Sequence, residues 1–176
     1  GTVARFDPVK NHTMMLKAFS KVLAKHPNTT LIIVGGGEER DNVERCIDTL
    51  NIASNVILTG YQTKPKNYLA LMDVYLLSSL SEGTSMTLLE AMSLSKPCVV
   101  TNAGGNPEIV TNNENGFVTP NDNAQMFAQG ITNILELTVS TNQFGQASKS
   151  RFDSQFSEEN MNKQYNCLYN QALSGN

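Results

Sequence analysis

The stretch SEGTSMTLLEAMSLSKPCVVTNAGGNPEIV at residues 81–110 holds one unit of the pattern that decides the fold. A glycine-containing loop leads into an apolar helical segment at 85–95, and an apolar β-rich segment follows at 97–101. Short apolar strands that alternate with longer helical segments are typical of parallel sheets built from βαβ units. The stretch therefore predicts an α/β domain.

The same alternation extends on both sides of this stretch. Strands are predicted at 2–6, 30–35, 55–60, 74–78, 97–101 and 116–119, and helices at 11–26, 38–50, 67–72, 85–95, 126–137, 145–152 and 158–173. From about residue 123 onward the chain carries helical patterns only. We therefore predict a Rossmann-like, doubly wound sheet of six parallel strands with C-terminal helices, in a single domain over residues 1–176.

The composition excludes several classes of protein. Charged residues make up 16% of the 176 residues and the formal net charge is -3, so nucleic acid and anionic membranes are not expected as direct partners. Cys46, Cys98 and Cys167 form no CxxC pair, which argues against a disulfide framework or a zinc site and indicates a reducing compartment. No apolar run approaches the roughly 20 residues that span a bilayer. Any bound anion must therefore be held by a few placed groups.

The helical segment at 85–95 begins with a candidate phosphate site. Ligands of open parallel sheets bind at the carboxyl ends of the strands, and this helix starts after the strand at 74–78. Ser85 is a good N-cap, and the first turn should present unpaired backbone N–H groups to an anion, those of Met86, Thr87 and Leu88.

Small and acidic residues surround this helix start. Gly83 lets the backbone approach a ligand closely, and Thr84 and Ser85 add hydroxyl groups. Glu90 lies about 7 Å past the cap along the helix, where its carboxylate is predicted to reach a ligand hydroxyl group. Glu82, in the loop before the helix, is expected to flank the same cradle from another side.

Further candidates follow the first two strands. Arg5 is expected to end a buried strand, which favours a functional role for it, and Lys10 follows shortly after. The GGG at 35–37 lacks the third glycine of a GxGxxG fingerprint, so we interpret it as a tight turn near a ligand. His12 and His26 have no metal-like spacing and are expected on helix surfaces.

Taken together, these residues resemble the donor-binding, C-terminal half of family 4 glycosyltransferases (glycosyl transferases group 1) of the GT-B fold. The resemblance rests on ARFDPVKN at 4–11, VGGGEER at 34–40, VILTGY at 56–61 and the stretch at 81–110, with Glu82 and Glu90 as its E-x7-E pair. It implies retaining transfer of a hexose-type sugar from a nucleotide diphosphate sugar, with UDP as the most frequent nucleotide. The implied acceptor is a glycan, a lipid or a small molecule, in cell-surface polysaccharide or glycoconjugate synthesis.

The resemblance also implies roles for particular residues. The implied catalytic residues are Arg5 and Lys10, which would neutralise the diphosphate, and Glu82, which would position the donor sugar. Glu90 would accept hydrogen bonds from the ribose. The implied nucleotide-sugar-binding residues are Gly60, Tyr61, Gly83, Thr84, Ser85, Met86, Thr87, Leu88 and Glu90, with Gln62 near the base and Gly104 and Gly105 near the sugar. No metal or other cofactor is implied.

A GT-B enzyme has a second, N-terminal half that binds the acceptor, and this half is absent from the sequence. We expect the chain to bind donor weakly and to transfer no sugar by itself. The implied location is the cytoplasm, with peripheral membrane association through the rest of the protein. The helix at 158–173 carries an apolar stripe formed by Met161, Tyr165, Leu168, Tyr169 and Leu173. The pattern alone predicts that this stripe belongs to the core. The resemblance implies instead that it is exposed here, because such helices often cross to the other half of the protein.

Two departures from the family pattern are visible. Ser78 and Ser79 stand where Pro-Ser is frequent, and Ser95 stands where a glycine is common. We expect neither departure to touch the proposed charged groups.

Three other functions are weighed against the transferase. The first is a non-catalytic nucleotide- or phosphosugar-binding module that keeps the phosphate cradle. A nicotinamide-dependent dehydrogenase is disfavoured because no GxGxxG follows the first strand. A receiver-like regulatory domain is disfavoured because only Asp7 follows that strand, where a pair of acids is expected.

Overall fold

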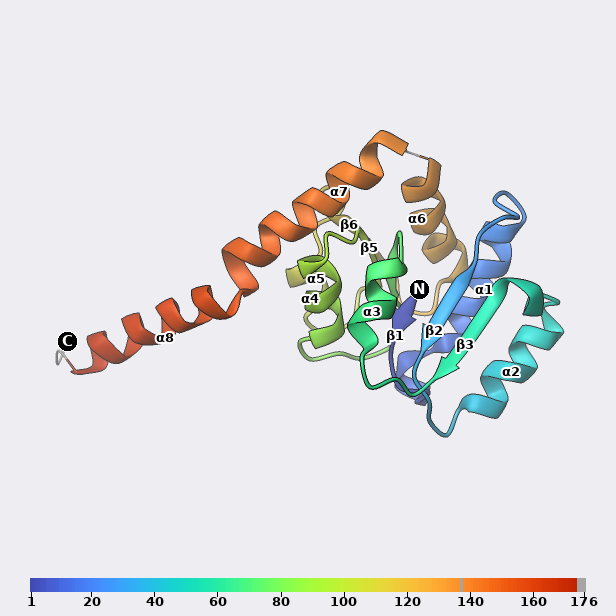
Figure 1. Cartoon of the computed structure of the whole chain (residues 1–176), viewed down its shortest axis with the longest axis horizontal. Helices are drawn as coiled ribbons and strands as arrows, with labels where there is room; N and C mark the ends of the chain where they lie inside the picture. Colours follow the sequence, from blue (N-terminus) through green and yellow to red (C-terminus); the bar gives the residue numbers. More distant parts are fainter. Residues whose placement is uncertain (137, 174–176) are drawn as a thin grey trace.

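The computed structural model describes residues 1–136 and 138–173 and shows an α/β domain (Figure 1). Its strands form two three-stranded parallel sheets with the orders β1-β2-β3 and β4-β5-β6. The strands are β1 (Thr2–Val3), β2 (Leu31–Val34), β3 (Val56–Gly60), β4 (Tyr75–Leu77), β5 (Cys98–Thr101) and β6 (Gly116–Thr119). The predicted parallel strands are confirmed, although the first ends at Val3 and does not reach Phe6.

Backbone hydrogen bonds at Gly1 join the two sheets. The Leu76 N–H donates to the Gly1 carbonyl at 2.8 Å, and the Gly1 amino group donates to the Val74 carbonyl at 2.8 Å. These bonds place β1 beside β4, so the order in space is β3-β2-β1-β4-β5-β6. In doubly wound folds with this order, the ligand crevice lies where the order reverses, between β1 and β4.

Helices cover both faces of the sheets (Figure 1). One face packs against α1 (His12–Leu23), α2 (Arg40–Thr49) and α6 (Ala124–Glu136), and the other against α3 (Pro65–Leu71) and α4 (Met86–Ser93). In β4, Leu76 belongs to the core on the α1 side, whereas Tyr75 and Leu77 belong to the core on the α4 side. Successive side chains of a strand point to opposite faces, so the unbroken apolarity of β4 follows from burial on both faces.

The C-terminal helices differ most from the prediction. The helix predicted at 145–152 is the last part of a longer helix, α7 (Thr138–Arg151), and a π-helical turn (Phe152–Phe156) follows it. Periodicity misses this because α7 packs only in part through large apolar side chains: Phe144 packs on Phe117, but a Cβ atom on Gly145 would lie 2.3 Å from the Ser95 carbonyl oxygen. The helix predicted at 126–137 is α6, and Leu137 lies outside the described residues.

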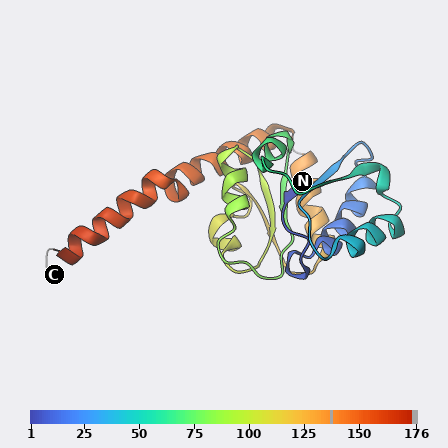
Figure 2. The same ribbon diagram turned by 60° about the horizontal axis from the view of Figure 1, so that its bottom comes forward.

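The last helix, α8 (Glu158–Leu173), extends away from the body of the domain (Figure 2). The large side chains of its apolar stripe are 47% to 85% exposed: Met161, Tyr165, Leu168, Tyr169 and Leu173. The interpretation of this stripe as core is therefore wrong, and its exposure agrees with what the resemblance implied. The predicted single domain over 1–176 includes residues 174–176, which lie outside the described residues.

Candidate functional site

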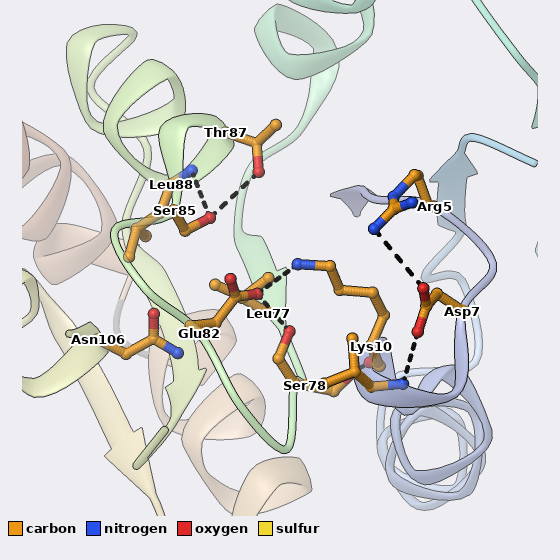
Figure 3. A network of polar contacts seen from close by, with 12 residues as sticks. Arg5, Asp7, Lys10, Leu77, Ser78, Glu82, Ser85, Thr87, Leu88 and Asn106 are labelled. Carbon is orange, nitrogen blue, oxygen red and sulfur yellow. Dashed lines mark hydrogen bonds and ion pairs between the residues drawn. The ribbon is translucent and has the colours of Figure 1, made fainter. Parts of the chain in front are cut away.

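Several of the predicted site residues gather at the carboxyl edge of the strands, beside the junction of β1 and β4 (Figure 3): Arg5, Lys10, Glu82, Ser85, Thr87 and Leu88. Three segments meet there: residues 4–10 after β1, residues 78–85 after β4, and the start of α4. Lys10 extends from the first segment toward Glu82 in the second, and Ser85 lies at the start of α4 close by (Figure 3). This edge is where the strand order predicts a ligand crevice.

An ion pair between Lys10 and Glu82 crosses the junction of the two sheets. The Lys10 Nζ lies 2.6 Å from the Glu82 Oε1, and the two side chains are only 19% and 9% exposed. The Ser79 hydroxyl donates to the same carboxylate oxygen at 2.6 Å. Partial burial strengthens the attraction between the two charges relative to water. The sequence predicted that these charges cluster, and it did not predict that they pair.

A short 3₁₀ turn, η1 (Pro8–Lys10), presents Lys10 to the site. The Asp7 side chain caps this turn by accepting a hydrogen bond from the Val9 N–H at 3.0 Å. The Leu80 N–H donates to the Val9 carbonyl at 2.8 Å, which ties the turn to the loop after β4. The position of the Lys10 ammonium is therefore fixed from both sheets.

Arg5 lies differently from the expectation. It does not end a strand, because β1 stops at Val3 and Arg5 follows two residues later. Its side chain is 79% exposed and pairs with Asp7 at 3.6 Å. The structure thus brings Arg5 to the same edge as Lys10, without a contact to Glu82 (Figure 3).

The start of α4 agrees with the predicted cap and corrects one donor. The Ser85 hydroxyl accepts a hydrogen bond from the Leu88 N–H at 3.4 Å, so the expectation that this amide is unpaired is wrong. Within the described residues the amides of Met86 and Thr87 have no acceptor. Unpaired N–H groups and the positive end of the helix dipole favour an anion at this position.

The Thr87 hydroxyl is hydrogen-bonded to a buried side chain of β4. It lies 2.7 Å from the hydroxyl of Tyr75, which is fully buried. Burial raises the pKa of Tyr75 well above its usual range, so this phenol stays neutral. This pair of hydroxyls therefore links the first turn of α4 to β4.

The glycines after β5 pack against the acidic loop. Gly104 has φ +50, and a Cβ atom there would lie 1.6 Å from the Glu82 carbonyl oxygen. The Gly105 N–H donates to the Gly83 carbonyl at 3.3 Å. A Cβ atom on Gly83 itself would meet nothing within 4 Å. The structure therefore gives Gly104 and Gly105 a packing role behind the loop, and leaves Gly83 facing open space.

The glycine segment at 35–37 packs against the segment that carries Arg5. A Cβ atom on Gly35 would lie 2.0 Å from the Ala4 carbonyl oxygen, and one on Gly37 would lie 2.4 Å from the Phe6 carbonyl oxygen. Both glycines have positive φ angles, 144 and 154. Residues 35–37 form an irregular connection and the turn itself follows at residues 38–39, so the turn was predicted too early; that the segment lies near a ligand stays a prediction. The close backbone contacts leave no room for a Cβ atom on Gly35 or Gly37.

The remaining predicted residues surround these segments. Glu90 is half-buried on α4, and its carboxylate has no partner within the described residues. Tyr61 is 83% exposed just after Gly60, which ends β3 with φ +70. The Gln62 side chain donates to the Thr59 carbonyl at 2.9 Å. Thr84 is exposed beside Ser85.

His12 is a residue that the sequence placed wrongly. It was expected on the helix surface, but it is 3% exposed and faces the core in the first turn of α1. Its Nε2 lies 3.0 Å from the Arg5 carbonyl oxygen, and its Nδ1 is buried without a partner. Burial lowers the pKa of His12 below its usual range, so the ring is neutral.

Ser78 and Ser79 are also closer to the charges than expected. The Ser79 hydroxyl bonds to Glu82, as described, and the Ser78 hydroxyl donates to the Lys10 carbonyl at 2.7 Å. The expectation that they do not touch the charged groups is therefore wrong: both serines are buried, and buried hydroxyls need partners. Ser95, by contrast, has φ +57, which is why a glycine suits its position.

The described part of the chain holds no group of three or more His, Cys, Asp or Glu side chains arranged to bind a metal ion. None of its helices is both long and apolar enough to cross a membrane.

Fold and site together define a Rossmann-like domain with an anion-binding edge, and solved structures identify it as half of a GT-B fold. The HepE protein of Anabaena, solved in complex with UDP, matches with a TM-score of 0.90 at 25% identity, over 97% of this chain and 48% of that chain. Residues 1–151 match the family model of glycosyl transferases group 1. The chain belongs to this family, as the C-terminal half of the GT-B fold.

Two curated relatives illustrate the family. The N-acetyl-alpha-D-glucosaminyl L-malate synthase of Bacillus anthracis is 27% identical over 97% of this chain and 45% of that protein. The poly(ribitol-phosphate) alpha-N-acetylglucosaminyltransferase of Staphylococcus aureus is 25% identical over 97% of this chain and 35% of that protein. The chain thus spans less than half the length of these relatives.

Proposed function

We propose that this chain is the donor-binding half of a retaining glycosyltransferase that takes a hexose-type sugar from a UDP-sugar. The observation that carries the proposal is the Lys10 ammonium, fixed by Glu82 at the junction of β1 and β4, on the same edge as the start of α4 with its unpaired amides of Met86 and Thr87. A diphosphate bound there meets one fixed cation and the positive end of a helix. The UDP bound by HepE, a relative of the same fold, supports uridine as the nucleoside of the donor.

We propose that residues of this chain stabilise the leaving group of the reaction. As the bond between the sugar's anomeric carbon and the β-phosphate oxygen breaks, negative charge grows on the diphosphate. Lys10, Arg5 and the amides of Met86 and Thr87 would stabilise that charge, because placed charges and dipoles act where charge develops. We propose that these groups make a metal ion unnecessary.

The two acids would hold the neutral parts of the donor. The Glu82 Oε1 is engaged by Lys10 and Ser79, whereas its Oε2 has no partner within the described residues. We assign Oε2 to a hydroxyl of the donor sugar. Glu90, whose carboxylate is also unengaged there, would accept hydrogen bonds from the ribose, with Gly60 and Tyr61 beside the base.

The acceptor and the linkage lie beyond this chain. Because the relatives are more than twice as long, we propose that the acceptor binds mainly to another half of the protein, and that the chain alone transfers no sugar. The Staphylococcus aureus relative, named for its action on poly(ribitol-phosphate), supports a role in cell-surface glycan synthesis. The free, exposed thiol of Cys167 fits a cytoplasmic location. Peripheral membrane contact would come through the rest of the protein.

Calorimetric titration with UDP, GDP and ADP, each with magnesium and with a chelator, tests the donor site. We expect UDP to bind best, equally under both conditions, and Lys10→Met and Glu90→Ala each to weaken it, the former by about tenfold or more. Lys149→Met, which removes a lysine of α7 from an exposed pair with Asp153, is the control. If none of the three nucleotides binds and the substitutions change nothing, the donor-site assignment fails.

The alternative is a binding module that has lost transfer. Its distinguishing test is turnover by the longer protein: a UDP-sugar consumed in the presence of acceptors supports the transferase, and tight UDP binding without turnover supports the module. Measurable sugar transfer by the 176 residues alone would contradict the proposal that a second half is needed.

A further inference from the structure

The two cationic residues of the site share a feature of their backbones. The carbonyl oxygen of each accepts a hydrogen bond from a buried side chain of another element. His12 of α1 bonds to the Arg5 carbonyl at 3.0 Å, and Ser78, just after β4, bonds to the Lys10 carbonyl at 2.7 Å. The segment at 5–10 is therefore held at its first and its last residue.

Both tethering side chains are inaccessible to a ligand. His12 is 3% exposed and Ser78 is 1% exposed. A carbonyl oxygen only accepts hydrogen bonds, so the His12 Nε2 must carry the proton of the neutral ring. That tautomer leaves Nδ1 as an acceptor, and Nδ1 is the atom that is buried without a partner. The ring also packs edge-on against Phe6, with ring centroids 5.0 Å apart, which fixes its orientation.

The segment between the two tethers depends on such contacts for its position. Its only regular structure is the three-residue turn η1, capped by Asp7. Ser78 leads into the loop that carries Glu82, so its hydroxyl joins the two sides of the site directly. The tether at Lys10 is thus built by the Ser78 hydroxyl.

We propose that His12 and Ser78 are positioning residues, which hold Arg5 and Lys10 at the distance from the start of α4 that a donor diphosphate requires. This inference rests on the proposed function. Neither residue touches the donor, and both act through the backbone of the cationic segment. Their loss should weaken interactions with the phosphates and leave interactions with the base and ribose unchanged.

Titrations with UDP and with uridine separate these two parts of the ligand. Ser78→Ala and His12→Leu are each expected to weaken UDP binding about fivefold to tenfold, the loss of roughly 1 kcal/mol, with uridine binding unchanged. His12→Gln, whose amide nitrogen can replace Nε2, should restore UDP binding to within about twofold of the parent chain. Chemical-shift titration by NMR measures the weak binding of uridine.

Ser148→Ala is the matched control. Ser148 is fully buried and donates to the Asn115 carbonyl at 3.1 Å, as Ser78 does to the Lys10 carbonyl, but it lies on α7. We expect its loss to leave UDP binding unchanged. Thermal unfolding of every variant shows whether the binding changes arise in folded protein. If His12→Leu does not fold, Ser78→Ala still tests the positioning role.

Three results would overturn the inference, and they are distinguishable. If Lys10→Met weakens UDP binding while Ser78→Ala and a folded His12→Leu do not, the positioning role fails and the proposed function stands. If UDP and uridine weaken equally, the two residues support the fold only. If the parent chain does not bind UDP and Lys10→Met has no effect, the proposed function fails and this inference fails with it.

Discussion

The edge between β1 and β4 and the helix α8 show two opposite uses of side chains in one chain. At the edge, charges and hydroxyls that are far apart in sequence are paired and largely buried, as Lys10 and Glu82 show. On α8, large apolar side chains are exposed along the helix. The contrast shows that the strand topology decides which side chains are buried. The periodicity of a helix does not show by itself whether its apolar face is covered.

Among the substitutions at the edge, the largest effect is expected from Gly104→Ala. An alanine there would have to adopt φ +50 and would place its Cβ atom 1.6 Å from the Glu82 carbonyl oxygen. We expect a loss of about 3 kcal/mol or more in the free energy of unfolding, measured by chemical denaturation. Gly83→Ala, in open space, should change it little; equal losses would mean that the loop after β5 does not pack as described.

The buried ion pair should matter more than an exposed one. Lys10→Met leaves the Glu82 carboxylate buried without its cation, which should lower the free energy of unfolding by about 2 kcal/mol. Lys163→Met breaks an exposed pair with Glu159 on α8 and should leave the thermal midpoint unchanged. Similar thermal shifts for the two variants would contradict the contrast between the regions.

His12 should give the edge a pH dependence. Burial lowers the pKa of His12 in the folded chain, so the unfolded chain binds its proton more readily as the pH falls. Stability should therefore decrease as the pH falls below about 6.5, and the decrease should level off below the lowered folded pKa. His12→Gln should remove this part of the profile. Identical profiles for the parent chain and His12→Gln would show that His12 titrates normally.

The smallest effect is expected on α8. Leu168 is 61% exposed, so Leu168→Glu should change neither the thermal midpoint nor UDP binding. Ile131→Glu on α6, where the side chain is 4% exposed, is the contrasting variant and should prevent stable folding. A large loss of stability in Leu168→Glu would mean that the stripe on α8 is buried against the domain.

Much of this fold could be predicted from the sequence, because its signals are local. Alternating apolar runs and helical segments gave the parallel strands, and Ser85 before an apolar run gave the cap of α4. The longer α7 was missed because its packing relies on Gly145, which adds nothing to an apolar pattern. The exposure of α8 was implied by the resemblance, since the pattern of an apolar stripe is the same whether or not a partner covers it.

The residues of the site could be predicted from the sequence more fully than the contacts between them. The sequence singled out Lys10 and Glu82, but their pairing depends on β1 lying beside β4, which no local pattern states. His12 sits in the first turn of α1, where the inward side is set by how the preceding loop enters the helix. Ser78 shows the same limit, because the acceptor of its hydroxyl is a backbone atom distant in sequence.

The most direct test of the central claim is to map UDP binding on the backbone amides by NMR, with uridine as the reference ligand. We expect the amides of Met86 and Thr87 and those of the segment at 5–10 to shift with UDP and to stay unchanged with uridine. Shifts near Gly60 and Tyr61 should occur with both ligands. If UDP instead shifts amides on α8 or at the amino ends of the strands, and leaves Met86 and Thr87 unmoved, the donor site does not lie at the edge between β1 and β4.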